Sequence, residues 1–491
     1  MVKTVVGEEI RLQLAEDHLA QSAIPAQVGL VIGKLNSKLD KGFIFDLVPT
    51  PANDDGDPPC SIIEPQKPEK KKGASKSRSF ADSSLFIDGD WVAEHARQVS
   101  RLLLGGVKVV GVYVWAGETV FKQSTLALCQ TVKGVADAVP FVENDLDEML
   151  LLHISYSPRR WTCRNCSLSS NITASSLRPC DFKMGRVFNS LQTFRCIYNV
   201  YLRLPISRAS LSTTKMLNDV LMDGISTLTK ELKSAKAIVD GNLVDVTTDK
   251  LCTSTNVHEV ELLLPPMKDA SLEANSQKDV VGILVYSGAV CSYSYLNSKE
   301  SVSQAVADIK EDIIISLRSR LDMISDEAER QITVSSEDVS ETNIEMLKVE
   351  SVYQITRQPL RKQCILPFPR RVFIPWLAGT FICDYLLPTE TFEALKDHFV
   401  ELLSMEAPED VSTFVQPENE HPSLAAKSFW DAAAPLYKSL DSAQNESRSR
   451  EIAKKGDSRK STAGSFNAAF AGLVLLIAVI FGSLFYAKSS R

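Results

Sequence analysis

The sequence has few histidines, and none of them forms a local pattern that is typical of an enzyme. No two histidines lie within four residues of each other, so neither an HxH nor an HExxH zinc motif is present. A Walker phosphate loop, a GxGxxG turn after a strand and a GxSxG elbow are also absent. The local signatures of zinc hydrolases, nucleotide-binding enzymes and serine hydrolases are therefore missing. The histidines are His18, His95, His153, His258, His398 and His421.

The sequence also lacks a net positive charge and an apolar leader. A net charge of −7 provides no general attraction for nucleic acid, so we expect no nucleic-acid partner. No apolar stretch follows the start MVKTVVGEEIRLQLAEDHL, which indicates that there is no signal peptide. We therefore expect the ten cysteines to be reduced thiols rather than a disulfide framework.

One group of cysteines contains a CxxC motif. Cys163 and Cys166 form this motif, and Cys180 and Cys196 follow as single residues. Strong zinc patterns pair two knuckles at regular spacing, whereas Cys196 falls inside a predicted strand. The pattern favours packing or surface thiols over a zinc or redox site, and it assigns no role to these four residues.

The C-terminus contains a long apolar run, Phe466 to Tyr486. From Ala468 to Tyr486 no side chain is charged, and such a helix would be about 28 Å long, close to the hydrocarbon thickness of a bilayer. Basic residues are more numerous before this run than after it, which places the long N-terminal part in the cytosol. We expect a tail-anchored protein of the endoplasmic reticulum membrane; the short, modestly basic tail leaves the mitochondrial outer membrane open.

Alternating strand and helix patterns predict an α/β (α+β) fold with two folded domains. The first domain is predicted at 1–158 with a poorly ordered insertion at 52–84, and the second at 180–405. A flexible linker is predicted at 406–464, and the acidic stretch 325–350 is expected to be poorly ordered.

Particular elements can be predicted within these domains. A helix is expected at 90–103, with Asp90 as its N-cap and Gly105-Gly106 at its end, followed by a buried strand at 108–115 and one helix at 119–135. In the second domain the pattern predicts separate strands at 280–286 and 290–296 and a long helix at 301–324, whose apolar stripe indicates a core position. A strand pair at 371–376 and 380–386 and a helix at 389–403 close the domain.

The first region resembles an MPN domain. The resemblance rests on Val28 to Lys34, Phe43 to Pro51 and Asp88 to Trp115. In the metalloprotease members of that fold, two histidines after the glycine-aromatic strand bind zinc; here Val114 and Ala116 occupy their positions. Neither side chain can bind a metal. The resemblance therefore implies a catalytically inactive domain without a metal, of a kind that usually serves as a dimerisation partner.

Over nearly its whole length the chain resembles the odorant-response-abnormal family of the protein-four type. The resemblance is carried by three segments, 90–112, 301–314 and 370–403. The positions that match the family motif are Trp91, His95, Arg101, Gly106, Gly111, Arg371, Pro375, Asp384, Tyr385, His398 and Phe399.

This family resemblance implies a non-enzymatic membrane adaptor of the endoplasmic reticulum that needs no cofactor. Its implied partners are the ubiquitin-fold-modifier-specific cysteine protease, multi-pass receptors whose folding and trafficking it assists, and the lipid bilayer. The alternative function is an MPN-type metal-dependent isopeptidase, which the missing metal ligands disfavour.

Overall fold

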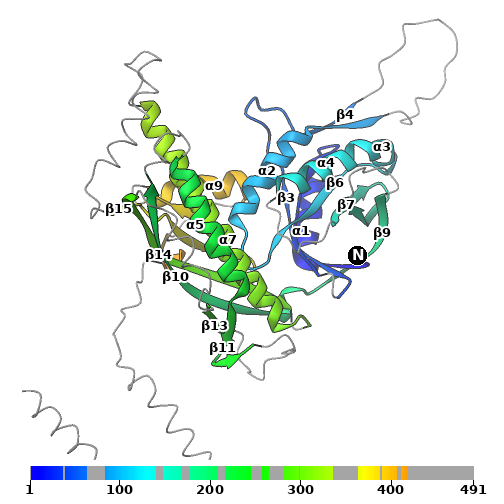
Figure 1. Ribbon diagram of the computed structural model, residues 1–491. Coiled ribbons are helices and arrows are strands. Elements are labelled where there is room, and N and C mark those ends of the chain that lie inside the picture. The colour runs from blue at the N-terminus through cyan, green and yellow to red at the C-terminus, as the bar shows by residue number, and fades with distance from the viewer. Residues whose placement is uncertain are drawn as a thin grey trace, which may run out of the picture. The chain divides into compact units, whose positions relative to one another are not determined.

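The computed structural model (Figure 1) describes most of the chain before residue 419. The predicted transmembrane helix at 466–486, most of the predicted linker at 406–464 and residues 64–82 of the predicted insertion lie outside the described residues. Within the described part of the chain, no helix has both the length and the apolar character needed to cross a bilayer. The described residues are 2–36, 39–63, 83–139, 148–168, 176–207, 216–244, 257–264, 280–297, 299–334, 363–387, 390–405 and 411–418.

Seven strands from the N-terminal part form a closed barrel. Their order is β1-β3-β2-β6-β7-β8-β9, and β9 pairs with β1 to complete it. Strand β6, with the sequence KVVGVYVW, is buried on both faces, as its β-branched and aromatic content predicts. The strands are β1 (Thr4–Glu8), β2 (Gln27–Asn36), β3 (Lys41–Pro49), β6 (Lys108–Trp115), β7 (Glu148–Tyr156), β8 (Arg159–Ser167) and β9 (Leu177–Gly185). Strands β4 (Cys60–Ile63) and β5 (Ser84–Ile87) form a separate hairpin.

Helices pack against both faces of the barrel wall. Helix α1 (Glu9–Gln21) buries Leu12 and Leu19 against one face. Helices α2 (Gly89–Leu102) and α4 (Thr125–Ala138) pack against the other face, because their apolar residues recur every three or four positions. The side chain of Asp88, and not the expected Asp90, caps α2 by accepting the Trp91 backbone N–H at 3.0 Å.

A six-stranded sheet follows the barrel in the chain, with the order β12-β11-β13-β10-β14-β15. Helices α5 (Met216–Ser234) and α7 (Val302–Val334) lie side by side across one face of it (Figure 1). The β11–β12 turn is at Asp240-Gly241, where both residues have positive φ, as a type I′ hairpin requires. The strands are β10 (Leu191–Ser207), β11 (Lys236–Val239), β12 (Asn242–Leu243), β13 (Val257–Leu263), β14 (Val280–Asn297) and β15 (Gln363–Ile365).

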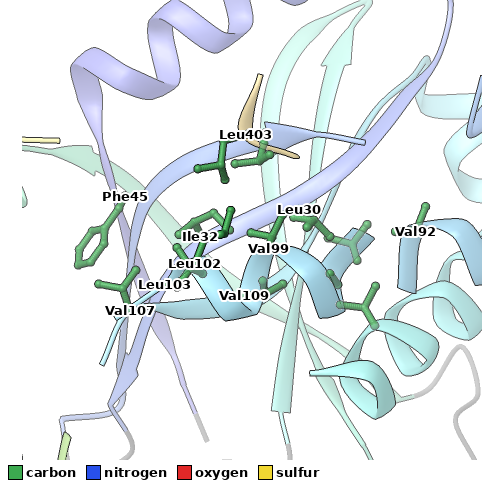
Figure 2. Close-up of a cluster of buried hydrophobic side chains, with 14 of the residues drawn as sticks. Leu30, Ile32, Phe45, Val92, Val99, Leu102, Leu103, Val107, Val109 and Leu403 are labelled. Carbon is green, nitrogen blue, oxygen red and sulfur yellow. The ribbon is translucent and has the colours of Figure 1, made fainter. Parts of the chain in front are cut away.

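The last elements of the described chain return to the N-terminal core. The hairpin β16 (Arg370–Pro375) and β17 (Phe381–Leu386), together with α9 (Phe392–Leu403), belongs to the same hydrophobic cluster as β2, α2 and β6. Figure 2 shows Leu403 among side chains of those elements. Residues 1–421 therefore form one unit, in which the two predicted domains share a core.

The mixed α/β class is confirmed, but several boundaries differ from those expected. The barrel continues past residue 158 through β8 and β9, whose mixed polar composition concealed them. Helix α7 extends to Val334, so the first part of the stretch 325–350 is helical. The predicted strands at 280–286 and 290–296 are one strand, β14, and the helix predicted at 119–135 is divided at Ser124 into α3 (Glu118–Gln123) and α4.

Candidate functional site

The two residues predicted to occupy the positions of the metal-binding histidines of MPN proteases lie in the hydrophobic core. Val114 and Ala116 are both fully buried. His153 is opposite Val114 in the β6–β7 register. Its Nε2–H donates to the Ala116 carbonyl oxygen at 3.0 Å, and its ring stacks on Phe121 with centroids 3.8 Å apart. Burial lowers the pKa of His153, so the ring is a neutral packing group whose Nε2 is already occupied.

Most buried thiols are unsuited to nucleophilic chemistry. Burial raises the pKa values of Cys60, Cys196 and Cys383 to about 12. It also raises those of Cys166 and Cys291 to about 11. Because the thiolate is the reactive form, these side chains are unreactive at neutral pH. Within the described ranges, no group of three His, Cys, Asp or Glu residues is arranged to hold a metal ion.

A line of buried polar and charged side chains lies on α7. Asp308, Asp312, Ser316 and Arg320 recur every fourth residue and therefore lie on one face of the helix. All four are buried. We call these residues the polar stripe. Ionised groups are rarely buried unless they are paired, so each charged member must find a partner of opposite charge on another element.

The first partner of the polar stripe comes from the barrel. The Nζ of Lys34, on β2, lies 2.6 Å from Asp308 and 3.7 Å from Glu300, and it donates to the Tyr295 carbonyl oxygen at 3.2 Å. Burial opposes the charge on Lys34, but the two carboxylates outweigh burial and raise its pKa. The ammonium group thus links the barrel to α7 and β14.

The second partner is Arg371 on β16. Its guanidinium donates to both carboxylate oxygens of Asp312, at 2.8 and 3.0 Å, which is the bidentate arrangement that binds most strongly. It also donates to the Tyr385 hydroxyl at 3.0 Å and to the Cys291 carbonyl oxygen at 3.2 Å. This single side chain therefore joins β16, β17, β14 and α7.

The third partner is Glu418, which follows the short helix η5 (Val411–Thr413). Arg320 donates to both of its carboxylate oxygens, at 2.7 and 2.6 Å, and is itself fully buried. Glu418 also accepts the backbone N–H groups of Cys291 at 2.9 Å and Arg371 at 2.6 Å. The segment 411–418 is thereby held against both β14 and β16.

Family-motif residues on α2 make a second set of links to the C-terminal elements. The carbonyl oxygen of Leu402 can only accept, so Nε2 of His95 donates to it, at 2.8 Å, and Nδ1 faces the Thr50 hydroxyl at 3.2 Å. Burial lowers the pKa of His95, which keeps the ring neutral. The Cys383 thiol donates to the Arg101 carbonyl oxygen at 3.8 Å.

The remaining family-motif residues also have structural roles. The Trp91 indole donates to the Pro51 carbonyl oxygen at 3.0 Å, and Gly106 adopts a positive φ beside Asp308. Phe399 is fully buried on α9, and Pro375 ends β16. The structure therefore brings most of these positions together as a framework around α2, α7 and β16–β17.

His398 and Asp384 form a pair in this framework, and the histidine of the pair is exposed. Nδ1 of His398 lies 3.0 Å from the Asp384 carboxylate, which raises the pKa of His398, with a smaller contribution from Glu401 and Glu390. The pKa of His398 is thus higher in the folded state than in the unfolded state. The stabilisation that the His398–Asp384 pair gives to the fold is therefore fully present below the unfolded pKa of about 6.5 and is lost as pH rises through the folded pKa.

We therefore expect His398→Gln to destabilise the chain most near pH 5.5 and least near pH 8.5. Urea unfolding of wild type and variant at both pH values measures this difference. In the Asp384→Asn background the pH dependence of the difference should largely disappear, because the carboxylate that raises the pKa is gone. A difference that stays constant or grows with pH would contradict this assignment.

One shallow surface depression of about 350 Å³ lies beside the start of α2. It contains no histidine or cysteine, and two of its residues already have roles, because Asp88 caps α2 and Trp91 bonds Pro51. It is lined by Asn53, Asp54, Asp55, Asp88, Asp90 and Trp91.

The predictions from sequence missed the polar stripe. Only the apolar residues of this helix were assigned to the core, because Asp and Arg are usually exposed. The available signal was the four-residue spacing of Asp308, Asp312, Ser316 and Arg320 beside an unbroken apolar stripe. Partners such as Lys34 and Glu418 are far away in the chain and carry no local signal.

Comparison with known proteins identifies relatives along most of the chain. The family model described as "ODR4-like: Odorant response abnormal 4-like" matches residues 29–414. "Protein odr-4 homolog" of Xenopus laevis is 24% identical over 426 residues, which cover 82% of this chain and 85% of that protein. "Protein odr-4 homolog" of Homo sapiens is 25% identical over 420 residues, which cover 81% of this chain and 82% of that protein.

A solved structure was also found. "Crystal structure of UfSP from C.elegans" aligns with a TM-score of 0.34 and 8% identity, covering 82% of this chain and 57% of that one. A score this low supports no inference about this chain, and the MPN-like character of the first region stays a prediction.

Proposed function

This chain belongs to the odorant response abnormal 4-like family, and from that membership we propose that it is a non-enzymatic adaptor anchored in the endoplasmic reticulum membrane by Phe466 to Tyr486. In this proposal the folded part binds the ubiquitin-fold-modifier-specific cysteine protease and holds it near that membrane. The same scaffold assists the folding and trafficking of multi-pass receptors.

The observation that carries the non-enzymatic part of the proposal is the environment of Val114 and Ala116. Both are sealed in an apolar cluster, and the adjacent His153 is neutral and already donates to Ala116. A catalytic zinc needs three protein ligands and an open position for water. Nothing in this part of β6 and β7 offers either, which disfavours the metal-dependent isopeptidase.

The buried ion pairs support a binding role in a different way. They hold the barrel, α7, β16–β17 and residues 411–418 in one arrangement. A partner that binds this unit therefore meets a surface that is already ordered. Binding then avoids the entropic cost of ordering a loop. A flexible tether to the membrane would raise the local concentration of a bound protease near membrane substrates without any new catalytic group.

We expect the purified full chain to contain no stoichiometric zinc and to cleave no modifier conjugate. Metal analysis by mass spectrometry and a conjugate-cleavage assay measure both properties. Zinc and cleavage appearing together, and both lost on treatment with a chelator, would replace the adaptor with the isopeptidase.

The proposal assigns the protease contact to the barrel. Helix α1 exposes Ile10 and Leu14, two apolar side chains one turn apart, which are 66% and 44% exposed. Ile10→Glu/Leu14→Glu in the full chain should therefore reduce recovery of the protease by affinity purification. The matched control is Gln13→Glu/Ala20→Glu, which adds two charges to exposed positions of the same helix. Equal recovery by both variants would exclude this face as the contact.

A deletion of residues 1–155 would not be a clean test of this contact. That deletion would leave β8 and β9 without the barrel, because β9 pairs with β1 and β8 pairs with β7. Loss of binding would then report unfolding, whereas the surface variants leave the buried core untouched.

A further inference from the structure

Two cysteines face each other across neighbouring strands of the barrel. Cys163 on β8 and Cys180 on β9 are directly opposite in the antiparallel register. Such residues have Cα atoms about 4.5–5.5 Å apart and side chains on the same face of the sheet. A disulfide needs a Cα separation of about 4.4–6.8 Å. The register therefore gives this pair a backbone spacing within the range of disulfides.

The buried pair Cys196 and Cys291 shows that two cysteines on neighbouring strands are not always placed to form a disulfide. On β10 and β14, Cys196 is opposite Ser292, and Cys291 is opposite Ile197. The two cysteines are therefore one register step apart and point to opposite faces of the sheet. Cys196 packs in the cluster beneath α5 and α7, whereas Cys291 packs with β16–β17.

The two sulfur atoms of the facing pair have different environments. Cys163 is buried among barrel side chains and is 4% exposed, whereas Cys180 is partly exposed and its sulfur lies 3.7 Å from the Val2 carbonyl oxygen. A hydrogen bond from the Cys163 thiol lowers the pKa of Cys180, and the same bond together with burial raises the pKa of Cys163. Among the eight cysteines whose side chains the structure describes, Cys180 is the one with a lowered pKa. Cys180 is accordingly the more exposed thiol of the pair and the one that ionises more readily, and Cys163 is the buried thiol beside it.

We propose that Cys163 and Cys180 are a reversible redox pair that forms a disulfide on reaction with a peroxide, fastening β9 to β8 in the barrel. The Cys180 thiolate attacks one peroxide oxygen and breaks the O–O bond, which gives a sulfenic acid and hydroxide that is protonated to water. The Cys163 sulfur then attacks the sulfenic sulfur, the S–S bond forms, and the hydroxyl leaves as a second water. Overall, two thiols and hydrogen peroxide give one disulfide and two waters.

The position of the disulfide determines how it affects the stability of the barrel. Strand β9 pairs with β8 through Leu177–Cys180 and with β1 from Asp181 to Gly185, so Cys180 stands where the strand passes from one neighbour to the other. A disulfide there closes the chain between 163 and 180 into a loop. Closing a loop of this size restricts the unfolded chain, and we expect a rise in Tm of about 5 °C. The inference does not depend on the adaptor function.

The test uses the purified full chain in detergent, fully reduced and then treated with a small excess of hydrogen peroxide. Remaining thiols are alkylated, and disulfide-linked peptides are identified by mass spectrometry. We expect Cys163 linked to Cys180, a higher Tm than that of the reduced protein, and reversal of both by dithiothreitol. In Cys163→Ser, Cys180 should accumulate as a sulfenic acid that dimedone traps. In Cys180→Ser, Cys163 should stay a free thiol.

The control variant is Cys166→Ala, which removes a thiol from the same strand, three residues from Cys163, that has no cysteine opposite it in the register. It should form the Cys163–Cys180 link as wild type does. Identification of the disulfide-linked peptides in the wild-type protein tests the proposal even if a variant fails to fold. Peroxide treatment that leaves Cys163 and Cys180 unlinked, or that links either of them to another cysteine instead, would overturn the proposal.

Discussion

Replacement of Arg371 by methionine is expected to lower the free energy of unfolding by about 3–5 kcal/mol, because it leaves a carboxylate buried without its partner. Asp312 is 5% exposed and loses both guanidinium hydrogen bonds. The Cys291 carbonyl oxygen and the Tyr385 hydroxyl lose a donor as well. Urea unfolding of the full chain, followed by tryptophan fluorescence, measures this loss.

Two further variants separate the ion pair from a general effect of losing an arginine. Arg370→Met changes the adjacent residue, which is only partly buried and whose guanidinium carbon lies 6.0 Å from the centroid of the Phe392 ring, and should cost about 1 kcal/mol or less. Arg371→Met/Asp312→Leu should recover a substantial part of the loss, because no charge is left unpaired. If the double variant is as unstable as the sum of its single variants, the ion pair is not the cause.

Gly111→Ala is the second substitution with a large expected effect. A Cβ at this position on β6 would overlap the carbonyl group of Leu150 on β7, and backbone atoms in a paired strand cannot move aside. We expect a loss of about 3 kcal/mol or more in the free energy of unfolding, at the upper end of overpacking costs. Circular dichroism during thermal unfolding measures the effect.

The same substitution elsewhere in this unit provides the control. Gly134 lies in α4, where a Cβ would meet only ordinary contacts with Ala93 and Gly89. Gly134→Ala should therefore stabilise the chain by about 0.5–1 kcal/mol through helix propensity. If both substitutions have the same effect, the close approach of β6 and β7 at Gly111 is not what requires a glycine.

The sequence predicts well those elements whose residues repeat regularly. Strand β6 and helices α2 and α9 have the apolar spacing or β-branched content of their class, and the structure confirms them within a few residues. The turn at Asp240-Gly241 was also predictable, because a type I′ turn needs residues that tolerate positive φ. These signals are local, so one sequence suffices to find them.

Contacts between residues far apart in the chain could not be predicted in this way. Strands β8 and β9 alternate weakly and contain several charged residues, and their place is set by closure of the barrel against β1 rather than by their own composition. Lys34 and Asp308 lie 274 residues apart. Two charged residues become a buried pair only once the fold brings them together, so the polar stripe and the facing cysteines required the structure.

The most direct test of the central claim follows the protease in cells that carry either the full chain or a chain ending at residue 465. With the full chain, the ubiquitin-fold-modifier-specific protease should co-purify and sediment with endoplasmic reticulum membranes after carbonate washing. With the shortened chain it should still co-purify, but both proteins should be in the soluble fraction. The account is contradicted if the protease stays on the membrane with the shortened chain, or if it never co-purifies with the full one.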